Sequence, residues 1–127
     1  RPTTPFRKDK IIINALKKFK KNKKKYSSLR SVSLMENSSF KTMRIINGKL
    51  CNIQNVDYDM DKLNLPRQSY PVTYVANGYV DILKTSNLFK NIFHGNKVCP
   101  FIVNDFNSDI DNLLDLKKVR KFKSNDK

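Results

Sequence analysis

The chain has 127 residues and a formal net charge of +15, with 39% hydrophobic, 10% aromatic and 29% charged residues. This length suits one domain with a hydrophobic core, and the apolar content argues against an intrinsically disordered chain. No apolar run approaches the roughly 18 to 20 residues of a membrane span and no secretory signal is recognisable, so we expect a cytoplasmic protein.

Most of the basic excess lies in residues 1–30, which hold 12 Lys and Arg against a single acid, Asp9. Residues 31–127 are more balanced, with 14 Lys and Arg against 10 Asp and Glu. Such a basic block can neutralise nucleic-acid phosphates, or it can be a solvated helix face and loop. No aromatic residue is interleaved with the lysines of residues 20–25 to stack on bases, so the solvated face is favoured and nucleic acid is an unlikely partner.

The first predicted elements are a helix and a strand. Residues 8–21 favour a surface helix downstream of Pro5, since apolar residues recur at helical spacing at Ile12, Ala15, Leu16 and Phe19. Residues 29–35 alternate and predict a strand. Residues 41–46 and 49–53, separated by Asn47-Gly48, predict a β-hairpin.

The second half of the chain continues the alternation of elements. Residues 54–71 are polar and predict a loop or an extended arm, and residues 72–75 and 79–83 predict strand pieces on either side of Asn77-Gly78. Residues 85–91 predict a short helix, and residues 98–103 predict a strand that Pro100 places at a sheet edge or bulge.

A helix is predicted to end the domain. Asn112 is a suitable N-cap with Asp115 three residues later, and a helical stripe follows at Leu113, Leu116 and Val119 up to Phe122, with residues 123–127 as a tail. Strands and helices thus alternate, which predicts a single α/β domain over residues 1–127. Cys51, Cys99 and His94 lack the spacing of a zinc site, and we expect both thiols to be reduced.

The paired acids Asp109 and Asp111 follow the last predicted strand and precede the last helix. In extended backbone, side chains two residues apart point to one face, so two carboxylates could share a hard cation such as Mg²⁺ with phosphate oxygens. The carboxyl edge of a parallel sheet is also where ligands of α/β proteins usually bind. The alternative is that both acids only charge the helix N-terminus.

Two further motifs suggest binding. Between Arg1 and Arg7, two prolines bracket the hydroxyl residues Thr3 and Thr4. This pattern predicts a rigid turn before a helix, which could bind an anion or a sugar. The alternative is that Thr3 or Thr4 is only the N-cap of the helix. In the segment 75–81, Asn77 could present an amide to a sugar or base, while the alternative is an ordinary turn or bulge.

Taken in order, five motifs resemble the acylneuraminate cytidylyltransferase family over essentially the whole chain, from Arg1 to about Val119. They are Arg1-Pro2-Thr3-Thr4-Pro5-Phe6-Arg7, Phe40-Lys41-Thr42-Met43 before the Asn47-Gly48 turn, Pro66-Arg67-Gln68, Asn77-Gly78-Tyr79-Val80-Asp81 and Ser108-Asp109-Ile110-Asp111. The first and last motifs are the most specific. The resemblance implies a cytidylyltransferase that transfers CMP from CTP to an acidic nine-carbon sugar of the sialic acid type and releases pyrophosphate.

The resemblance also implies roles for single residues. Asp109 and Asp111 would be the catalytic residues that hold Mg²⁺ near the CTP phosphates, and Asn77 would lie at the sugar pocket. Lys41 and Arg67 would belong to a protruding dimerisation arm, about residues 36–71, and meet the sugar carboxylate of the partner's site. The other substrate-binding positions are Arg1, Thr3, Thr4, Arg7 and Gln68. Arg1 departs from the family, which commonly has Gln there, and the alternative for Lys41 and Arg67 is surface charge.

The implied fold is a nucleotide-diphospho-sugar transferase-like, Rossmann-like mixed sheet flanked by helices, in a homodimeric enzyme. The chain has only three glycines, Gly48, Gly78 and Gly95, and none lies in a glycine-rich CTP loop after a first strand. We therefore expect a C-terminal portion that lacks the N-terminal strands and has no turnover alone. The rival hypotheses are a small basic nucleic-acid-binding protein that uses the lysine-rich N-terminal block, and a non-catalytic protein with the family fold.

Overall fold

The computed structural model describes residues 5–55, 58–104, 110 and 112–125, and it is a mixed α/β structure. Two compact units divide the chain: the first comprises Arg1–Ser33 and Ala76–Lys127, and the second comprises Leu34–Val75. The segment that the resemblance assigns to an arm, about residues 36–71, falls within the second unit. Within the described part of the chain, no helix is long and apolar enough to cross a bilayer.

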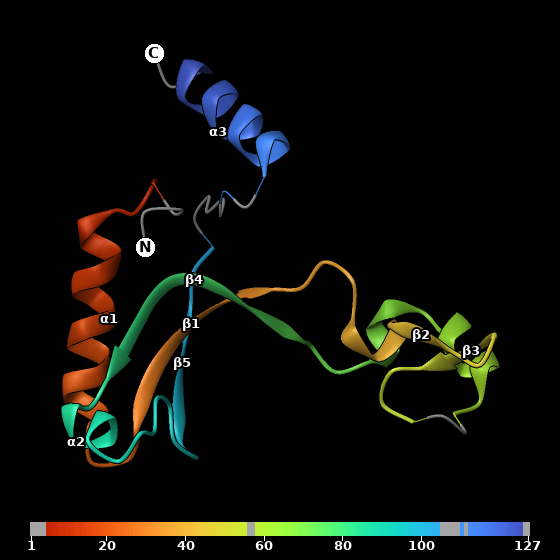
Figure 1. The fold of residues 1–127 in the computed structure, drawn as a ribbon, viewed down its shortest axis with the longest axis horizontal. Coiled ribbons are helices and arrows are strands. Elements are labelled where there is room, and N and C mark those ends of the chain that lie inside the picture. Colours follow the sequence, from red (N-terminus) through yellow and green to blue (C-terminus); the bar gives the residue numbers. More distant parts are fainter. Residues whose placement is uncertain (1–4, 56–57, 105–109, 111, 126–127) are drawn as a thin grey trace. The chain divides into compact units, whose positions relative to one another are not determined.

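A three-stranded mixed sheet forms the centre of the first unit. Its strands are β1 (Ser28–Leu34), β4 (Tyr74–Leu83) and β5 (Val98–Ile102), in the order β4-β1-β5. β1 and β5 are parallel, with Leu29 opposite Cys99, whereas β4 runs in the opposite direction (Figure 1). The predicted strand at residues 98–103 is confirmed, and Pro100 does lie on an edge strand, where its missing N–H does least damage.

The helix α1 (Asp9–Asn22) packs on this sheet. Ala15 and Phe19 are buried against Leu29 of β1 and Cys99 of β5, and these four residues form the core cluster. The predicted helix is confirmed, but its stripe is narrower than expected, because Leu16 is 41% exposed. The N-cap is Lys8, with no side-chain cap, so an N-cap at Thr3 or Thr4 is wrong.

The second unit contains the predicted hairpin. The strands β2 (Met43–Ile46) and β3 (Lys49–Asn52) are antiparallel, with Ile46 opposite Lys49. Asn47 and Gly48 have φ of 49° and 74°, as a two-residue primed turn requires. The following segment is not a plain loop, because it forms two 3-10 helices at Met60–Asn64 and Arg67–Ser69; a third lies at Ser39–Lys41.

The segment around Asn77 and Gly78 differs from the prediction. Two strand pieces were expected there, yet β4 is one continuous strand from Tyr74 to Leu83. Gly78 has a φ of 64° within it, an angle that glycine adopts at little cost and that bends the strand without ending it. Pairing of β4 with β1 therefore overrides the local turn signal.

The last two helices agree with the prediction in part. α2 (Thr85–Leu88) is shorter than the predicted 85–91. α3 (Leu113–Asn125) extends three residues beyond the predicted end, into the expected tail. Asn112 caps it, since its Oδ1 accepts hydrogen bonds from the backbone N–H of Leu114 and Asp115 at 2.9 and 3.1 Å. In the expected stripe Val119 is buried, but Leu113 is 76% exposed. Both cysteines are free thiols, as expected.

Replacing Gly95 by alanine should destabilise the first unit. Gly95 has a φ of +71°, and an added Cβ would lie 2.9 Å from Ser27 Oγ and 3.0 Å from Ser27 Cβ. The left-handed angle alone costs about 1–2 kcal/mol in a residue with a Cβ, and the steric clash adds to this. Gly48→Ala is the matched control, because Gly48 has a similar φ of +74° but nothing within 4 Å. Urea unfolding followed by circular dichroism should show a larger loss for Gly95→Ala, and equal losses would contradict this account.

Candidate functional site

A pocket of about 260 Å³ in the first unit brings two of the sequence motifs together. Arg7, just before α1, lines it together with Gly78, Tyr79 and Asp81 of β4. Ile12 on the first turns of α1 and Val80 complete the lining. The first motif and the Asn77–Asp81 motif thus meet around one concave surface.

Tyr79 ties the second motif to Lys8, the residue that follows the first motif. Its side chain is fully buried, and its phenol oxygen accepts a hydrogen bond of 2.6 Å from the backbone N–H of Lys8, 71 residues away. Because a hydrogen bond is directional, this buried phenol fixes the distance between β4 and the residue before α1 more tightly than an apolar contact would. The position of Arg7 is therefore set by the residue next to it.

Asn77 links the three strands where β1 and β5 end. Its Nδ2 donates to Ser33 Oγ at 2.8 Å, and its Oδ1 accepts from the Tyr79 N–H at 3.1 Å. Ser33 Oγ donates in turn to the Val103 carbonyl oxygen at 3.2 Å. Asn77 is not among the residues that line the pocket, whereas its neighbour Gly78 is. The amide thus holds β4 against β1 next to Gly78, which lines the pocket.

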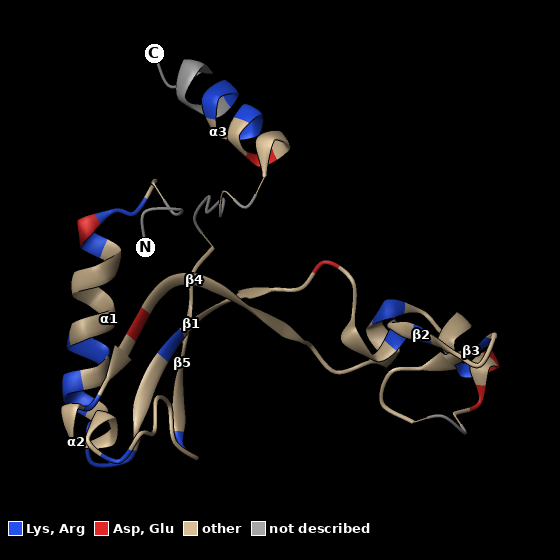
Figure 2. Ribbon diagram, in the orientation of Figure 1, with Lys and Arg blue, Asp and Glu red and all other residues tan. Residues whose placement is uncertain are grey.

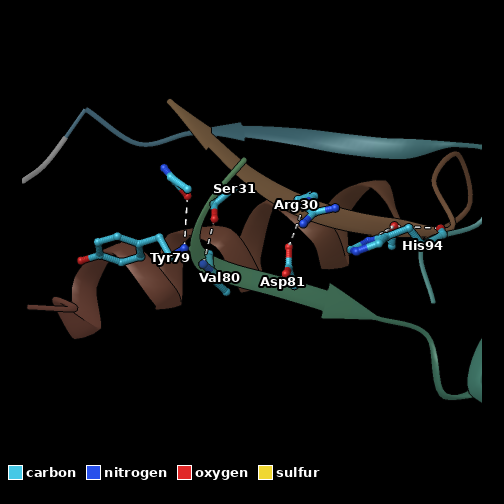
Figure 3. A network of polar contacts seen from close by, with 8 residues as sticks. Arg30, Ser31, Tyr79, Val80, Asp81 and His94 are labelled. Carbon is cyan, nitrogen blue, oxygen red and sulfur yellow. Dashed lines mark hydrogen bonds and ion pairs between the residues drawn. The ribbon is translucent and has the colours of Figure 1, made fainter. Parts of the chain in front are cut away.

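Polar pairs also connect β1 to β4 along the rest of the strand, as Figure 3 shows. Ser31 Oγ, which is buried, accepts the Val80 N–H at 2.8 Å. Arg30 Nε lies 3.7 Å from Asp81 Oδ1, on half-exposed side chains. This ion pair balances the charge of Asp81, a carboxylate that lines the pocket.

The remaining first-unit candidates lie outside the described residues. They are Arg1, Thr3, Thr4, Asp109 and Asp111. Of the described residues that flank the two aspartates in the chain, Val103 donates its N–H to Val32 O at 2.9 Å, and Asn112 caps α3. Among the residues that the structure does describe, no three His, Cys, Asp or Glu side chains gather as metal ligands.

Three candidates lie in the second unit, and two of them share a pocket of about 280 Å³. Arg67 and Gln68 line it, together with Tyr70, with Leu34 at the end of β1 and with Met35 after it. An Arg67 guanidinium N–H donates to Met35 O at 2.7 Å, which holds the side chain at the pocket. Lys41 does not line it: the ammonium donates to Leu65 O at 2.6 Å and lies 5.4 Å from the centre of the Tyr70 ring.

Tyr70 organises this second pocket. Its ring stacks on Phe40 at a centroid distance of 6.2 Å, and its hydroxyl donates to the Lys62 carbonyl oxygen. Partial desolvation and, secondly, the Tyr58 phenol raise the pKa of Tyr70 above its ordinary value. The hydroxyl therefore remains a donor throughout the neutral range, beside a lysine and an arginine.

Sequence reasoning missed the residues that assemble these pockets: Ser31, Ser33, Tyr70 and Tyr79. The alternation in β1 places Ser31 and Ser33 on the face of buried Leu29, and that was the one available signal. A small hydroxyl residue on a core face usually has a hydrogen-bond partner.

Replacing Tyr79 by phenylalanine should remove the hydrogen bond to Lys8 while leaving the buried ring in place. We expect a loss of about 1 kcal/mol in unfolding free energy, the usual net contribution of one hydrogen bond. Tyr74→Phe is the control, because Tyr74 lies on the same strand and is exposed. Urea titrations of both variants measure the difference, and an unchanged Tyr79→Phe midpoint would contradict the role given to the phenol.

Comparison with known proteins assigns the chain to no family. No protein-family model matches it, and no curated protein sequence matches it.

Proposed function

We propose that this chain is part of a cytidylyltransferase that transfers CMP from CTP to an acidic nine-carbon sugar in the cytoplasm. The sugar's anomeric hydroxyl oxygen would attack the α-phosphorus of CTP, and the bond to the β-phosphate would break. Pyrophosphate would leave, and the hydroxyl proton would pass to solvent or a base. Such a reaction depends mainly on positioning and charge neutralisation.

One observation carries the proposal: Arg7 and the Gly78–Asp81 segment line one pocket. The resemblance to the acylneuraminate cytidylyltransferases assigns both motifs to substrate binding. The hydrogen bonds of Tyr79 and Asn77 give this pocket rigid walls, as a site that positions a sugar needs. The mixed sheet and its helices are compatible with the Rossmann-like, nucleotide-diphospho-sugar transferase-like fold that the proposal implies.

The donor set at the β5–α3 connection suits Mg²⁺. Asp109 and Asp111 would supply hard carboxylate oxygens, the ligands that Mg²⁺ prefers alongside phosphate oxygens. When bound, the ion would neutralise charge on the triphosphate.

In the second unit, Arg67 and Gln68 would take part in sugar recognition. A guanidinium can grip a carboxylate with two hydrogen bonds, which suits an acidic sugar. The proposal keeps the homodimer that the resemblance implies, in which this unit would serve the partner's site. Lys41 would act from beside Tyr70, against which it packs.

The direct test is an assay of the full-length gene product with CTP, Mg²⁺ and a panel of sugars. We expect CMP-sugar and pyrophosphate from sialic, legionaminic or pseudaminic acid, and none from neutral hexoses. The 127-residue chain alone should give no product, because it lacks a glycine-rich CTP loop. Failure of the full-length protein with every acidic sugar would sink the proposal.

A further inference from the structure

A lysine-lined groove lies at the amino ends of β1 and β5. Its volume is about 560 Å³, and five lysines line it: Lys24, Lys25, Lys84, Lys90 and Lys97. They come from the turn after α1, from the end of β4 and from the segment between α2 and β5. Figure 2 shows basic segments gathered at the end of α1, in the turn that follows and beside α2.

The groove is uniformly positive. None of the residues that line it is Asp or Glu, and none of its lysines forms an ion pair with a described side chain. The sequence places only Lys24 and Lys25 within its lysine-rich block, and folding adds the other three. Five like charges around one hollow repel each other, and an anionic ligand would relieve that repulsion.

Hydrogen bonds hold the sides of the groove in place. Ser27 Oγ donates to His94 O at 2.6 Å, and Ser27 N–H donates to Lys97 O at 2.7 Å. Asn87 Nδ2 donates to Ser27 O at 3.1 Å, which ties the α2 region to the same residue. Gly95 packs so closely on Ser27 that a Cβ would clash. The backbone segments that carry the lysines are therefore held together by hydrogen bonds and do not form independent loops.

Exposed aromatic rings adjoin the groove in the chain. Lys90 and Ile92 line the groove. Phe89, which precedes Lys90, is 86% exposed, and Phe93, which follows Ile92, is 68% exposed. Both rings are therefore accessible to a ligand. The segment after α2 could thus supply the base-stacking groups that the lysine-rich block lacks in sequence.

We propose that this groove binds single-stranded nucleic acid, with lysines on the phosphates and Phe89 and Phe93 stacked on bases. Lysines lining a hollow favour a strand that enters it over a flat lipid surface, and exposed rings favour unpaired bases over a duplex. The inference is independent of the proposed transferase activity, because none of the residues that line the groove lines the Arg7 pocket.

The test is fluorescence anisotropy of the full chain with a labelled 12-nucleotide oligo(dT) across salt concentrations. The variant Lys84→Gln with Lys97→Gln removes two groove charges. Lys10→Gln with Lys17→Gln removes two charges from exposed positions of α1 outside the groove and is the matched control. Each neutralised phosphate contributes about 0.7 to the slope of log K against log salt. The groove variant should bind roughly tenfold more weakly with a slope smaller by about 1.4, and the control should change less than about threefold.

Phe89→Ala tests stacking separately from charge. We expect about a tenfold loss of affinity with an unchanged salt slope, and no loss for Ile45→Ala, an apolar site in the second unit that is 75% exposed. Equal weakening by both lysine pairs, equal affinity for a duplex of the same length, or binding to phosphatidylserine vesicles without binding to the oligonucleotide would each overturn the proposal.

Discussion

Replacing Asp109 and Asp111 together by asparagine should reduce CMP-sugar formation by the full-length gene product at least about a thousandfold. Asparagine keeps the size and a carbonyl oxygen but removes both negative charges that would bind the divalent ion. A metal that neutralises a triphosphate supplies several kcal/mol of transition-state stabilisation, and each 1.36 kcal/mol is tenfold in rate. Initial rates at saturating CTP, over a range of Mg²⁺ concentrations, measure the effect.

The chain offers its own control in a second Asp-x-Asp pair, Asp59 and Asp61. It lies at the start of a 3-10 helix in the second unit, where Asp59 Oδ1 accepts the Asp61 N–H at 3.1 Å. Asparagine can serve as the same cap, so Asp59→Asn with Asp61→Asn should change the rate less than about threefold. If both double variants lose activity equally, or if Asp109→Asn with Asp111→Asn stays active, the metal role is wrong.

Leu29→Ala should be the most destabilising single change in the first unit. Leu29 is fully buried on β1 in a core cluster with only three other members: Ala15, Phe19 and Cys99. Truncating a buried leucine typically costs 2–5 kcal/mol through lost transfer free energy and a residual cavity. That is a large part of the roughly 5–15 kcal/mol that stabilises a typical domain.

Leu34→Ala is the control, since Leu34 ends the same strand and is 50% exposed. It should cost less than about 1 kcal/mol, because little apolar area is removed from water there in the folded state. Urea unfolding followed by far-ultraviolet circular dichroism compares the two. Similar midpoints for both variants would contradict the placement of the core at Leu29.

The fold was predictable where the signals are local. The spacing of apolar residues predicted α1, Asn47-Gly48 predicted the hairpin, and Asn112 predicted the start of α3. The errors arose where distant contacts decide. Asn77-Gly78 favours a turn in isolation, yet pairing with β1 keeps β4 extended through it. Leu16 fits the helical period as well as Ala15 does, and only the position of the sheet distinguishes them.

Less of the candidate site was predictable. The motif order assigned Arg7 and Asn77 to one substrate site, and the structure places Arg7 beside Gly78, with Asn77 behind the pocket wall. The bond from Lys8 to Tyr79 spans 71 residues, so no local pattern reveals it. The lysine groove was equally hidden, because three of its five lysines are scattered in sequence and meet only on folding.

The most direct test of the central claim is to locate a divalent ion on the ¹⁵N-labelled chain by paramagnetic broadening with Mn²⁺, a substitute for Mg²⁺. If Asp109 and Asp111 grip the ion together, the backbone amide signals of Ile110 and Asn112 should broaden first. These signals should persist in the variant that has asparagine at both positions. Broadening that appears first at Asp59–Asp61, or that spares Ile110 and Asn112 altogether, would contradict the account.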